Sequence, residues 1–269
     1  MKVSILISVY NEAATVATLL ERVWTQPLPG ITKEIIIVES NSNDGSREIV
    51  ADFVRRHAAR SSIRIDVIFQ DRARGKGHAI REAFAAATGN IYLIQDADLE
   101  YDVSDYPDLL KPITEGRSAF VLGSRYLGPR GWKIRTFERN SFLSGVANVA
   151  GILLHSFFNI VYGTRLTDPT TMYKVFRADC LNGLNFTCER FDFDWELVGK
   201  LIRAGFEPLE ISVNYRSRAF HQGKKIRMFK DPPTWIIAIL KTRFATLYVP
   251  KGRAAQVSAP PTVKVRRRR

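Results

Sequence analysis

The first 125 residues alternate short apolar segments with helical patterns, and few folds accommodate that alternation. The apolar segments are rich in Val and Ile, and several are apolar at consecutive positions, as is typical of strands covered on both faces. The predicted strands are residues 3–9, 34–38, 63–69, 91–95 and 119–123. The predicted helices between them are residues 12–24, 46–60, 77–87 and 106–115. Because repeated strand–helix–strand units form right-handed crossovers, we expect an α/β domain whose mostly parallel central sheet is flanked by helices.

The second half of the chain is less regular, and its longest feature is an apolar helical pattern over residues 139–162. About 20 apolar residues can span a bilayer, but Asn148, His155 and Asn159 interrupt this segment. We therefore expect a buried or membrane-surface helix rather than a spanning one. The other predicted elements are a helix over residues 192–205, a strand over 208–213 and a basic loop over 216–231.

A Pro-Pro pair at residues 232 and 233 introduces the last helical pattern, over residues 234–248. Its apolar residues recur at helical spacing, with Lys241 and Arg243 between them. Such a basic amphipathic helix either lies in a membrane interface or docks on the domain. Residues 250–269 contain no acid and end in four arginines, a pattern typical of a disordered tail. The sequence thus predicts a globular domain over residues 1–231, an amphipathic helix over 232–249 and a basic tail over 250–269.

The net charge of +13 is concentrated at the C-terminal end of the chain. Residues 214–269 hold 15 Lys and Arg residues and one acid, whereas residues 1–213 hold 25 basic and 26 acidic residues. A nucleic-acid-binding domain usually carries its basic residues on the folded face. The near-neutral globular part therefore argues against a nucleic-acid partner, and the basic end favours an anionic membrane surface.

The two cysteines, Cys180 and Cys188, have neither a zinc nor a redox spacing. They cannot build a disulfide scaffold, so a reducing cytosol is expected. The opening residues have an apolar run too short for a signal peptide, and no small-residue cleavage site follows. We expect the protein in the cytoplasm, peripherally associated with the cytoplasmic face of a membrane.

Three acidic side chains, Asp96, Asp98 and Glu100, follow the fourth predicted strand. Alternation along an extended backbone directs them to the same side. Carboxylates at a strand end are costly unless they are paired, solvated or bound to a cation. Hard oxygen ligands suit Mg²⁺ or Mn²⁺, which often bridge protein carboxylates and a substrate diphosphate. A solvated acidic loop is the alternative.

Polar groups also follow the first two predicted strands, at the sheet edge where open α/β folds bind ligands. The ring of Tyr10 could stack on a nucleobase, with Ser8 and Glu12 beside it, and Glu39 could accept hydrogen bonds from a ribose or a base. The alternatives are that Glu12 merely begins the following helix and that residues 43–45, Asn-Asp-Gly, form a simple turn.

Seven elements, in this order, make the chain resemble a family 2 glycosyltransferase with the glycosyltransferase A fold. Within that family it is similar to the polyprenyl (dolichyl) phosphate mannosyl- and glucosyltransferases. The matching elements are residues 2–12, residues 35–46, the Gly-Lys-Gly loop at 75–77, the acidic motif at 95–101, Gly-Ser-Arg at 123–125, Asp-Pro-Thr-Thr at 168–171, and Arg218 with Gly-Lys-Lys at 223–225. The resemblance implies that residues 1–231 form the catalytic domain.

The resemblance also implies roles for the first half of the chain. The donor nucleotide would be held by Ser8, Tyr10, Glu12, Glu39, Lys76, Asp96 and Ala97. Asp96, Asp98 and Glu100 would ligate Mg²⁺ or Mn²⁺, the last two most directly. Family members usually have Asp where this chain has Glu39, so the donor base is left open between a GDP-hexose and a UDP-hexose.

For the acceptor, the resemblance implies a set of cationic side chains around a phosphate. These are Arg125, Arg139, Arg218, Lys224 and Lys225. Arginine suits the task because its planar fork meets phosphate oxygens bidentately. The implied catalytic residues are Asp98, Arg125 and Asp168, with Asp168 organising the site. The alternatives are a surface ion pair for Arg139 and a solvated basic loop around Arg218.

The function implied by the resemblance is an inverting, metal-dependent transfer of mannose or glucose from a nucleotide sugar to a polyprenyl phosphate. A separate membrane-anchoring subunit is a further candidate partner. A second hypothesis is transfer to a saccharide hydroxyl in cell-surface polysaccharide synthesis, which needs a general base. Asp194 and Glu196 are the candidate bases, although we expect both in the exposed first turn of an ordinary helix. A third hypothesis is a non-catalytic basic protein that binds RNA or membranes.

Overall fold

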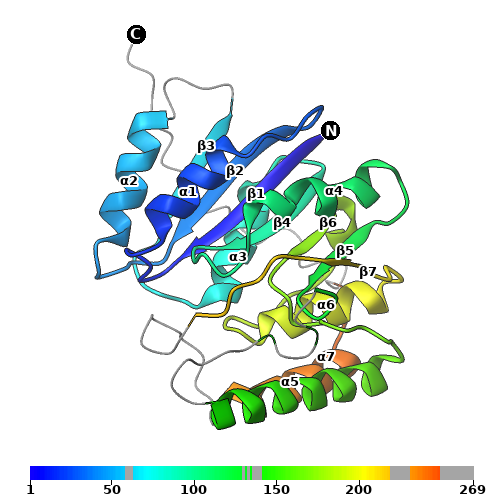
Figure 1. Ribbon diagram of the computed structural model, residues 1–269. Coiled ribbons are helices and arrows are strands. Elements are labelled where there is room, and N and C mark those ends of the chain that lie inside the picture. Colours follow the sequence, from blue (N-terminus) through cyan, green and yellow to red (C-terminus); the bar gives the residue numbers. More distant parts are fainter. Residues whose placement is uncertain (58–62, 129–130, 132–133, 135–140, 219–230, 249–269) are drawn as a thin grey trace.

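The computed structural model describes residues 1–57, 63–128, 131, 134, 141–218 and 231–248. Its centre is a seven-stranded sheet in the order β3-β2-β1-β4-β6-β5-β7 (Figure 1). The strands are β1 (Lys2–Val9), β2 (Thr32–Glu39), β3 (Arg64–Phe69), β4 (Ile91–Asp96), β5 (Phe120–Ser124), β6 (Lys174–Arg177) and β7 (Leu209–Ser212). The predicted α/β class and the mostly parallel sheet are confirmed.

Strands β1 to β4 form the parallel half of the sheet. Residues of β1 and β2 are almost all buried, which explains their consecutive apolar positions. The pairs Val9 with Glu39 and Ser8 with Asp96 are in register, so the carboxyl ends of β1, β2 and β4 lie at one edge. Strand β6 was not predicted. It is four residues long and pairs antiparallel with both β4 and β5.

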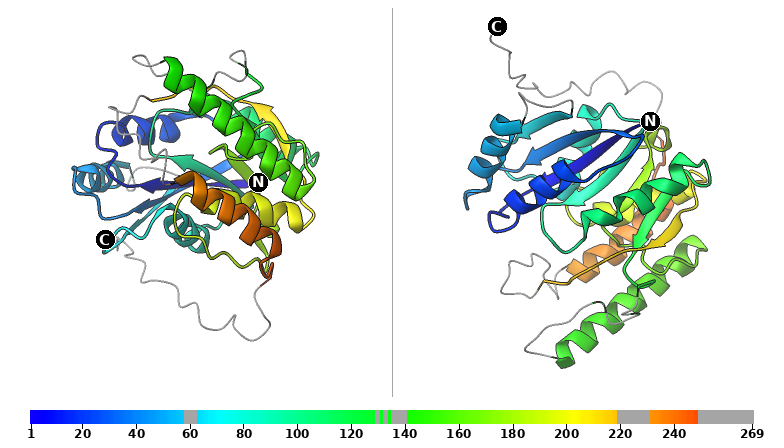
Figure 2. Two further views of the ribbon diagram at one scale, coloured as in Figure 1. Left: turned by 90° about the horizontal axis from the view of Figure 1, so that it is seen from below. Right: turned by 45° about the horizontal axis from the view of Figure 1, so that its top comes forward.

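Helices cover both faces of the sheet, as Figures 1 and 2 show. They are α1 (Val16–Thr25), α2 (Ser46–His57), α3 (Lys76–Ala86), α4 (Tyr106–Thr114), α5 (Ser141–Tyr162), α6 (Phe193–Arg203) and α7 (Asp231–Phe244), with short 3₁₀ turns η1 (Val103–Asp105) and η2 (Ala178–Leu181). Helices α1, α2 and α4 share one apolar core with the sheet. Helices α3 and α6 pack on the opposite face.

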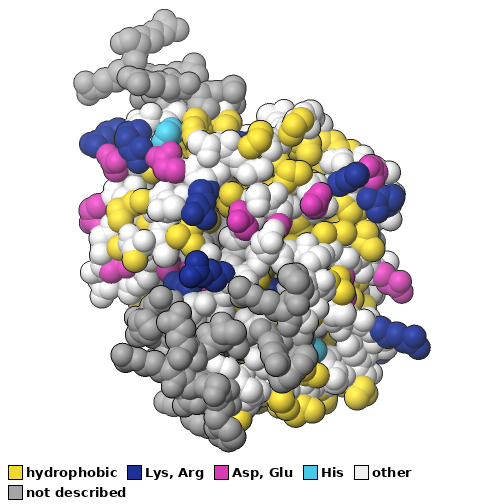
Figure 3. Space-filling model, viewed as in Figure 1, with side chains coloured by type: hydrophobic (Ala, Val, Ile, Leu, Met, Phe, Trp, Pro, Cys, Tyr) yellow, Lys and Arg dark blue, Asp and Glu magenta, His cyan; other side chains and the backbone are white. Residues whose placement is uncertain are grey.

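Helices α5 and α7 lie side by side in an outer layer over α6 (Figure 2). Phe158 of α5 and Ile239 of α7 are fully buried in the core that contains Trp195 of α6. Their outward faces remain apolar and exposed, most of all at Ile160 and Phe244, each 81% exposed. In Figure 3 hydrophobic side chains appear along the lower edge of the molecule, where α5 lies. The last helix therefore docks on the domain and still presents an apolar face.

The apolar segment within α5 is long enough to be considered as a membrane span. Among the described residues, Ser144–Tyr162 is the one helical segment whose length and composition would allow it to cross a bilayer, with a mean hydropathy of 1.4. The helix also carries buried polar side chains, Asn148 and His155, on its inner side. One side of the helix therefore packs against the domain.

The opposite edge of the sheet is held by a buried carboxylate, Glu34 of β2. It accepts hydrogen bonds from the Ser4 hydroxyl and the Thr88 and Gly89 backbone N–H groups, and it pairs with Lys2 and Arg64. Burial alone would raise the pKa of this carboxyl, but the hydrogen bonds from Lys2, Ser4 and Thr88 outweigh it and lower the pKa to about 2. The ionised form therefore stabilises the fold.

We predict that Glu34 makes the protein sensitive to acid. Its pKa lies below the ordinary value of 4.5, so its contribution is complete above that value and is lost as the pH falls toward 2. That loss amounts to about 3 kcal/mol of unfolding free energy. Urea unfolding between about pH 6 and pH 2.5 should show a shallower pH dependence in Glu34→Gln than in the wild type. The matched surface variant Glu115→Gln should keep the wild-type slope, and equal slopes in all three proteins would contradict the prediction.

Candidate active site

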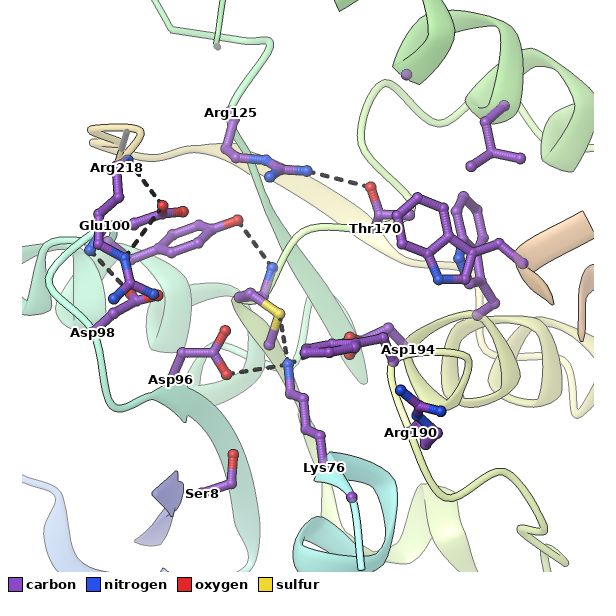
Figure 4. A pocket seen from close by; sticks show the side chains of 18 of the residues that line it. Ser8, Lys76, Asp96, Asp98, Glu100, Arg125, Thr170, Arg190, Asp194 and Arg218 are labelled. Carbon is purple, nitrogen blue, oxygen red and sulfur yellow. Dashed lines mark hydrogen bonds and ion pairs between the residues drawn. The ribbon is translucent and has the colours of Figure 1, made fainter. Parts of the chain in front are cut away.

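A cavity of about 970 Å³ opens at the carboxyl ends of β1 and β4. Its polar lining includes the residues that follow these strands and the loop before α3. Helix α5, the first turn of α6, and the first turns of α7 complete the wall. Figure 4 shows charged side chains from these separate segments converging on the cavity. The predicted site residues that line it are Ser8, Tyr10, Glu12, Lys76, Asp96, Ala97, Asp98, Glu100, Arg125 and Arg218.

Two asparagines shape the edge where β1 and β2 end. Asn11 and Asn41 have left-handed backbone conformations, with φ of 50° and 55°, which asparagine adopts more readily than most residues. The Asn11 side chain accepts a hydrogen bond from the Asn43 N–H at 3.0 Å, and the Asn11 N–H donates to the Ser42 hydroxyl at 2.9 Å. These bonds join the two strand ends, so Tyr10 is presented at the cavity on a fixed turn.

The acidic motif divides its side chains between two cations. Strand β4 ends at Asp96, so the extended alternation does not continue through Asp98 and Glu100. Asp96 faces the ammonium of Lys76 at 3.1 Å, whereas Asp98 and Glu100 face the guanidinium of Arg218 (Figure 4). All three acids line the cavity, but they do not point at one common centre.

Arg218 is surrounded by three carboxylates. Its guanidinium lies 2.8 Å from Glu12, 2.7 Å from Asp98 and 3.5 Å from Glu100. Burial, together with the neighbouring charges of Asp96 and Glu100, raises the pKa of Asp98 to about 7, although Arg218 opposes the shift. Glu100 also accepts hydrogen bonds from the Tyr215 hydroxyl and the Arg218 N–H. Residues 215–218 are therefore tied to the end of the acidic motif.

The carboxylates around Arg218 are the residues that could hold a divalent metal. Within the described part of the chain, no group of three His, Cys, Asp or Glu side chains is arranged as a ready-made metal site. Mg²⁺ is commonly bound through one or two carboxylates together with substrate phosphates and water. Asp98 and Glu100 supply hard oxygen ligands of that kind, and they already enclose a cation. The donor set fits a metal that is completed by a diphosphate.

The predicted nucleoside residues do not all reach the cavity. Ser8, Tyr10 and Glu12 line it, but Glu39 is fully buried beside it. The Glu39 carboxylate accepts hydrogen bonds from the Ser42 N–H at 2.7 Å and from Arg47 at 2.9 Å. In this structure Glu39 thus organises the turn after β2. The neighbouring Ser40 is the residue of this turn that lines the cavity.

Arg125 and Asp168 form a buried bidentate ion pair. The Arg125 guanidinium donates to the two Asp168 carboxylate oxygens at 2.6 and 2.7 Å, and the Arg125 N–H donates to the same carboxylate at 3.1 Å. Burial would raise the pKa of Asp168, but Arg125 holds it below its ordinary value. Arg125 lines the cavity and Asp168 lies behind it. Asp168 can therefore orient Arg125 without contacting a ligand in the cavity.

Asp194 and Glu196 are buried in the first turn of α6, so the expectation that they would be exposed was wrong. Asp194 lies between the ammonium groups of Lys76 and Lys174, at 3.3 and 2.9 Å. Glu196 pairs with Lys200 at 2.7 Å and caps the N–H groups of Thr187 and Cys188. Both carboxylates are occupied by partners because the start of α6 packs inside the domain rather than on its surface.

One end of the cavity is apolar, and no short sequence motif predicted it. Its wall combines small residues of α5 with large side chains of α5 and α7, namely Ala147, Ala150, Gly151, Leu154, Phe157, Trp235 and Ile236. The helical periodicity of both segments was visible in the sequence, but nothing there showed that the two helices meet beside the acidic motif. The predicted residues Arg139, Lys224 and Lys225, and the tail over 250–269, lie outside the described residues.

Comparison with known proteins identifies the class. The family model for glycosyl transferase family 2 matches residues 4–184, and the chain belongs to this family. The resemblance drawn from the seven sequence elements is thereby confirmed.

Three relatives show which members of the family are similar in sequence. The dolichol-phosphate mannosyltransferase of Pyrococcus furiosus is 26% identical over 84% of this chain and 61% of its own length. The undecaprenyl-phosphate 4-deoxy-4-formamido-L-arabinose transferase of Aeromonas hydrophila is 26% identical over 82% of this chain and 62% of its own length. A dolichyl-phosphate β-glucosyltransferase of Trichomonas vaginalis is 29% identical over 79% of this chain and 65% of its own length. The chain thus spans less than two thirds of the length of these relatives.

Solved structures support the fold. Glucosyl-3-phosphoglycerate synthase from Mycobacterium tuberculosis, crystallised with Mn²⁺, UDP-glucose and phosphoglyceric acid, has a TM-score of 0.64 and 17% identity. The match covers 90% of this chain and 79% of that one. TarS of S. aureus in complex with UDP has a TM-score of 0.57 and 16% identity, and the match covers 91% of this chain and 67% of that one. At sequence identities of 16 and 17%, these matches show a shared fold, that is, a similar arrangement of the sheet and helices.

We predict that Arg218 competes with a divalent cation for Asp98 and Glu100. Two cations cannot both occupy the space between these carboxylates without strong repulsion. Titration with Mn²⁺, followed by calorimetry or electron paramagnetic resonance, should therefore show about tenfold tighter binding in Arg218→Gln than in the wild type. Arg216→Gln removes the same charge from an exposed neighbour and should leave the affinity unchanged. Unaltered or weaker Mn²⁺ binding in Arg218→Gln would contradict the competition.

Proposed function

We propose that this protein transfers a hexose, mannose or glucose, from a GDP- or UDP-sugar to a polyprenyl phosphate. The observation that carries the proposal is the two-ended cavity. One end gathers the acidic motif and cationic side chains suited to a nucleoside diphosphate, and the other is an apolar wall between α5 and α7. A charged headgroup attached to a hydrocarbon chain matches both ends at once.

The donor would bind along the ends of β1 and β4. Tyr10 provides a ring for the base and Lys76 provides a cation for the diphosphate, and both line the cavity. Asp98 and Glu100 would hold Mg²⁺ or Mn²⁺. The metal, when bound, supplies positive charge that stabilises the diphosphate leaving group. Lys76 adds to that stabilisation from a fixed position, so less reorganisation is needed as negative charge develops.

The acceptor phosphate would be oriented by Arg125, whose guanidinium is fixed by Asp168. One phosphate oxygen attacks the anomeric carbon from the face opposite the leaving group. A carbon–oxygen bond forms there while the bond to the nucleoside diphosphate breaks, and the configuration inverts. The attacking oxygen is already anionic near neutral pH, so no proton must be removed. Asp194 and Glu196, both paired with lysines, fit a reaction that needs no general base.

The proposed reaction can be tested by product analysis. Recombinant protein, polyprenyl phosphate, Mg²⁺ and a radiolabelled GDP- or UDP-hexose should yield a chloroform-soluble, acid-labile sugar phosphate. Asp98→Asn should lower the rate at least 100-fold, because a neutral amide binds a divalent cation much more weakly. Asp108→Asn, an exposed acid on α4, is the matched control and should retain activity. Absence of a lipid-phase product with either donor would contradict the lipid acceptor, and an aqueous product that forms only when an oligosaccharide is added would replace it with a saccharide.

The same proposal places the protein on the cytoplasmic face of an anionic membrane, with α5 and α7 as the contact surface. Both helices expose apolar side chains, including Ile160 and Phe244. Lys241 and Arg243 lie in the last turn of α7, where each could contribute about 1 kcal/mol of attraction to an acidic surface. The apolar wall of the cavity belongs to the same two helices, so a lipid could enter from the membrane without crossing water.

We expect the double variant Ile160→Glu/Phe244→Glu to lose binding to vesicles of phosphatidylglycerol and phosphatidylcholine. Two carboxylates on the contact surface would have to be desolvated beside anionic lipid. Sedimentation with vesicles should show at least a tenfold drop in the bound fraction at limiting lipid. Ala51→Glu adds a carboxylate to the exposed surface of α2, away from α5 and α7, and should bind like the wild type. Equal binding by all three proteins would show that another surface contacts the membrane.

A further inference from the structure

Four side chains of alternating charge form a continuous row from the cavity into the core. Asp96 contacts Lys76 at 3.1 Å, Lys76 contacts Asp194 at 3.3 Å, and Asp194 contacts Lys174 at 2.9 Å. Lys76 and Asp194 line the cavity, whereas Lys174, the first residue of β6, is fully buried and does not. The row connects the cavity floor to β6.

The backbone around Lys76 leaves it little freedom to move. Gly75 has a φ of 93°, and a Cβ atom there would collide with the backbone of Glu189. A Cβ atom on Gly77 would lie 2.6 Å from the Cys188 carbonyl oxygen and 2.6 Å from the Phe193 Cβ atom. Both glycines are needed because the loop packs directly against the segment that leads into α6. Asp194 follows this segment as the second residue of α6, so the loop and the Asp194 carboxylate are fixed relative to each other.

The charges of the row determine what Lys76 can offer to a ligand. Asp96 and Asp194 both face Lys76, and without a further cation these two acids would outweigh its charge and repel an anion. Lys174 supplies a second positive charge on the far side of Asp194, so the four side chains of the row together are neutral, whereas without Lys174 they would carry a net charge of −1. Burial lowers the pKa of Lys174, and Lys76 lowers it further, while Asp194 opposes both. Lys76 keeps a raised pKa despite its burial because Asp194 and Asp96 face it.

We infer that Asp194 and Lys174 are positioning residues for the donor diphosphate, acting through Lys76. Asp194 fixes the ammonium of Lys76 at the cavity floor, and Lys174 neutralises Asp194 so that the charge of Lys76 remains available. The inference rests on the proposed nucleotide-sugar donor and adds two residues to its diphosphate site. It also gives Asp194 a role other than that of a general base.

The test measures the binding of UDP and GDP, and of the corresponding nucleosides, at a fixed Mn²⁺ concentration. Lys174→Met keeps about the volume of the buried side chain and removes its charge, so Asp96 and Asp194 then outweigh Lys76 and the row carries a net charge of −1. Calorimetry should show about tenfold weaker binding of the preferred nucleoside diphosphate. Binding of the nucleoside, followed by ligand-observed NMR, should not change, because it carries no phosphate. Retained nucleoside binding also shows that the variant has kept its fold.

The double variant Lys174→Met/Asp194→Asn separates this role from a merely structural one. Removing both members of the buried pair takes away one charge of each sign and returns the row to the neutral wild-type balance, so diphosphate affinity should return to within about threefold of the wild type. If the two residues only supported packing, the double variant would bind more weakly than the single one. Arg177→Met, which breaks an exposed ion pair with Asp179 at the end of the same strand, should bind like the wild type.

The outcomes distinguish the inference from the function on which it rests. A wild-type protein that binds neither UDP nor GDP would overturn the nucleotide-sugar site and the inference together. A wild type that binds, with an equal affinity in Lys174→Met, would overturn the inference alone. Failure of the double variant to recover affinity would do the same. Weakening in the single variant with recovery in the double variant supports it.

Discussion

The structure depends on the compensation of carboxylates that are buried at one edge of the sheet. Asp98, Asp168 and Asp194 are each less than a tenth exposed, and an unpaired ionised group so far from water would be very costly. Each meets a cation from a distant part of the chain, namely Arg218, Arg125, and Lys76 with Lys174. Because every acid must keep its counter-ion, the loops that carry these residues are fixed against the ends of the strands.

This requirement also explains why the site is suited to phosphate chemistry. A cavity that contains several fixed cations and hard oxygen ligands can accept a diphosphate by exchanging one ionic partner for another. Arg218 already occupies the place that a metal bound to Asp98 and Glu100 would require. Lys76 already lines the cavity, and Lys174 contacts Asp194 behind it. The protein therefore holds much of the electrostatic environment of the proposed reaction before a substrate binds.

The second half of the chain adds an apolar surface to this polar site. Helices α5 and α7 pack on α6 through buried side chains such as Phe158 and Ile239, and they leave an apolar face outside. The cavity reaches the inner surface of both helices at Gly151 and Trp235. A single pair of helices thus connects the site to the surface that would meet lipid. Adjacent parts of one fold therefore combine a polar site with an apolar surface.

Much of the fold and part of the site follow from local sequence. The apolar runs and helical spacings predict most elements to within a few residues, and Tyr10, Lys76 and Asp98 were identified from short motifs. Strand β6 was missed because it is defined by antiparallel pairing with β4 and β5, which lie far from it in the chain. The burial of Asp194, its pairing with Lys174, and the apolar wall of α5 and α7 were decided by tertiary structure. They depend on contacts between residues far apart in the chain, and local pattern carries no information about which distant charge or helix will be the neighbour.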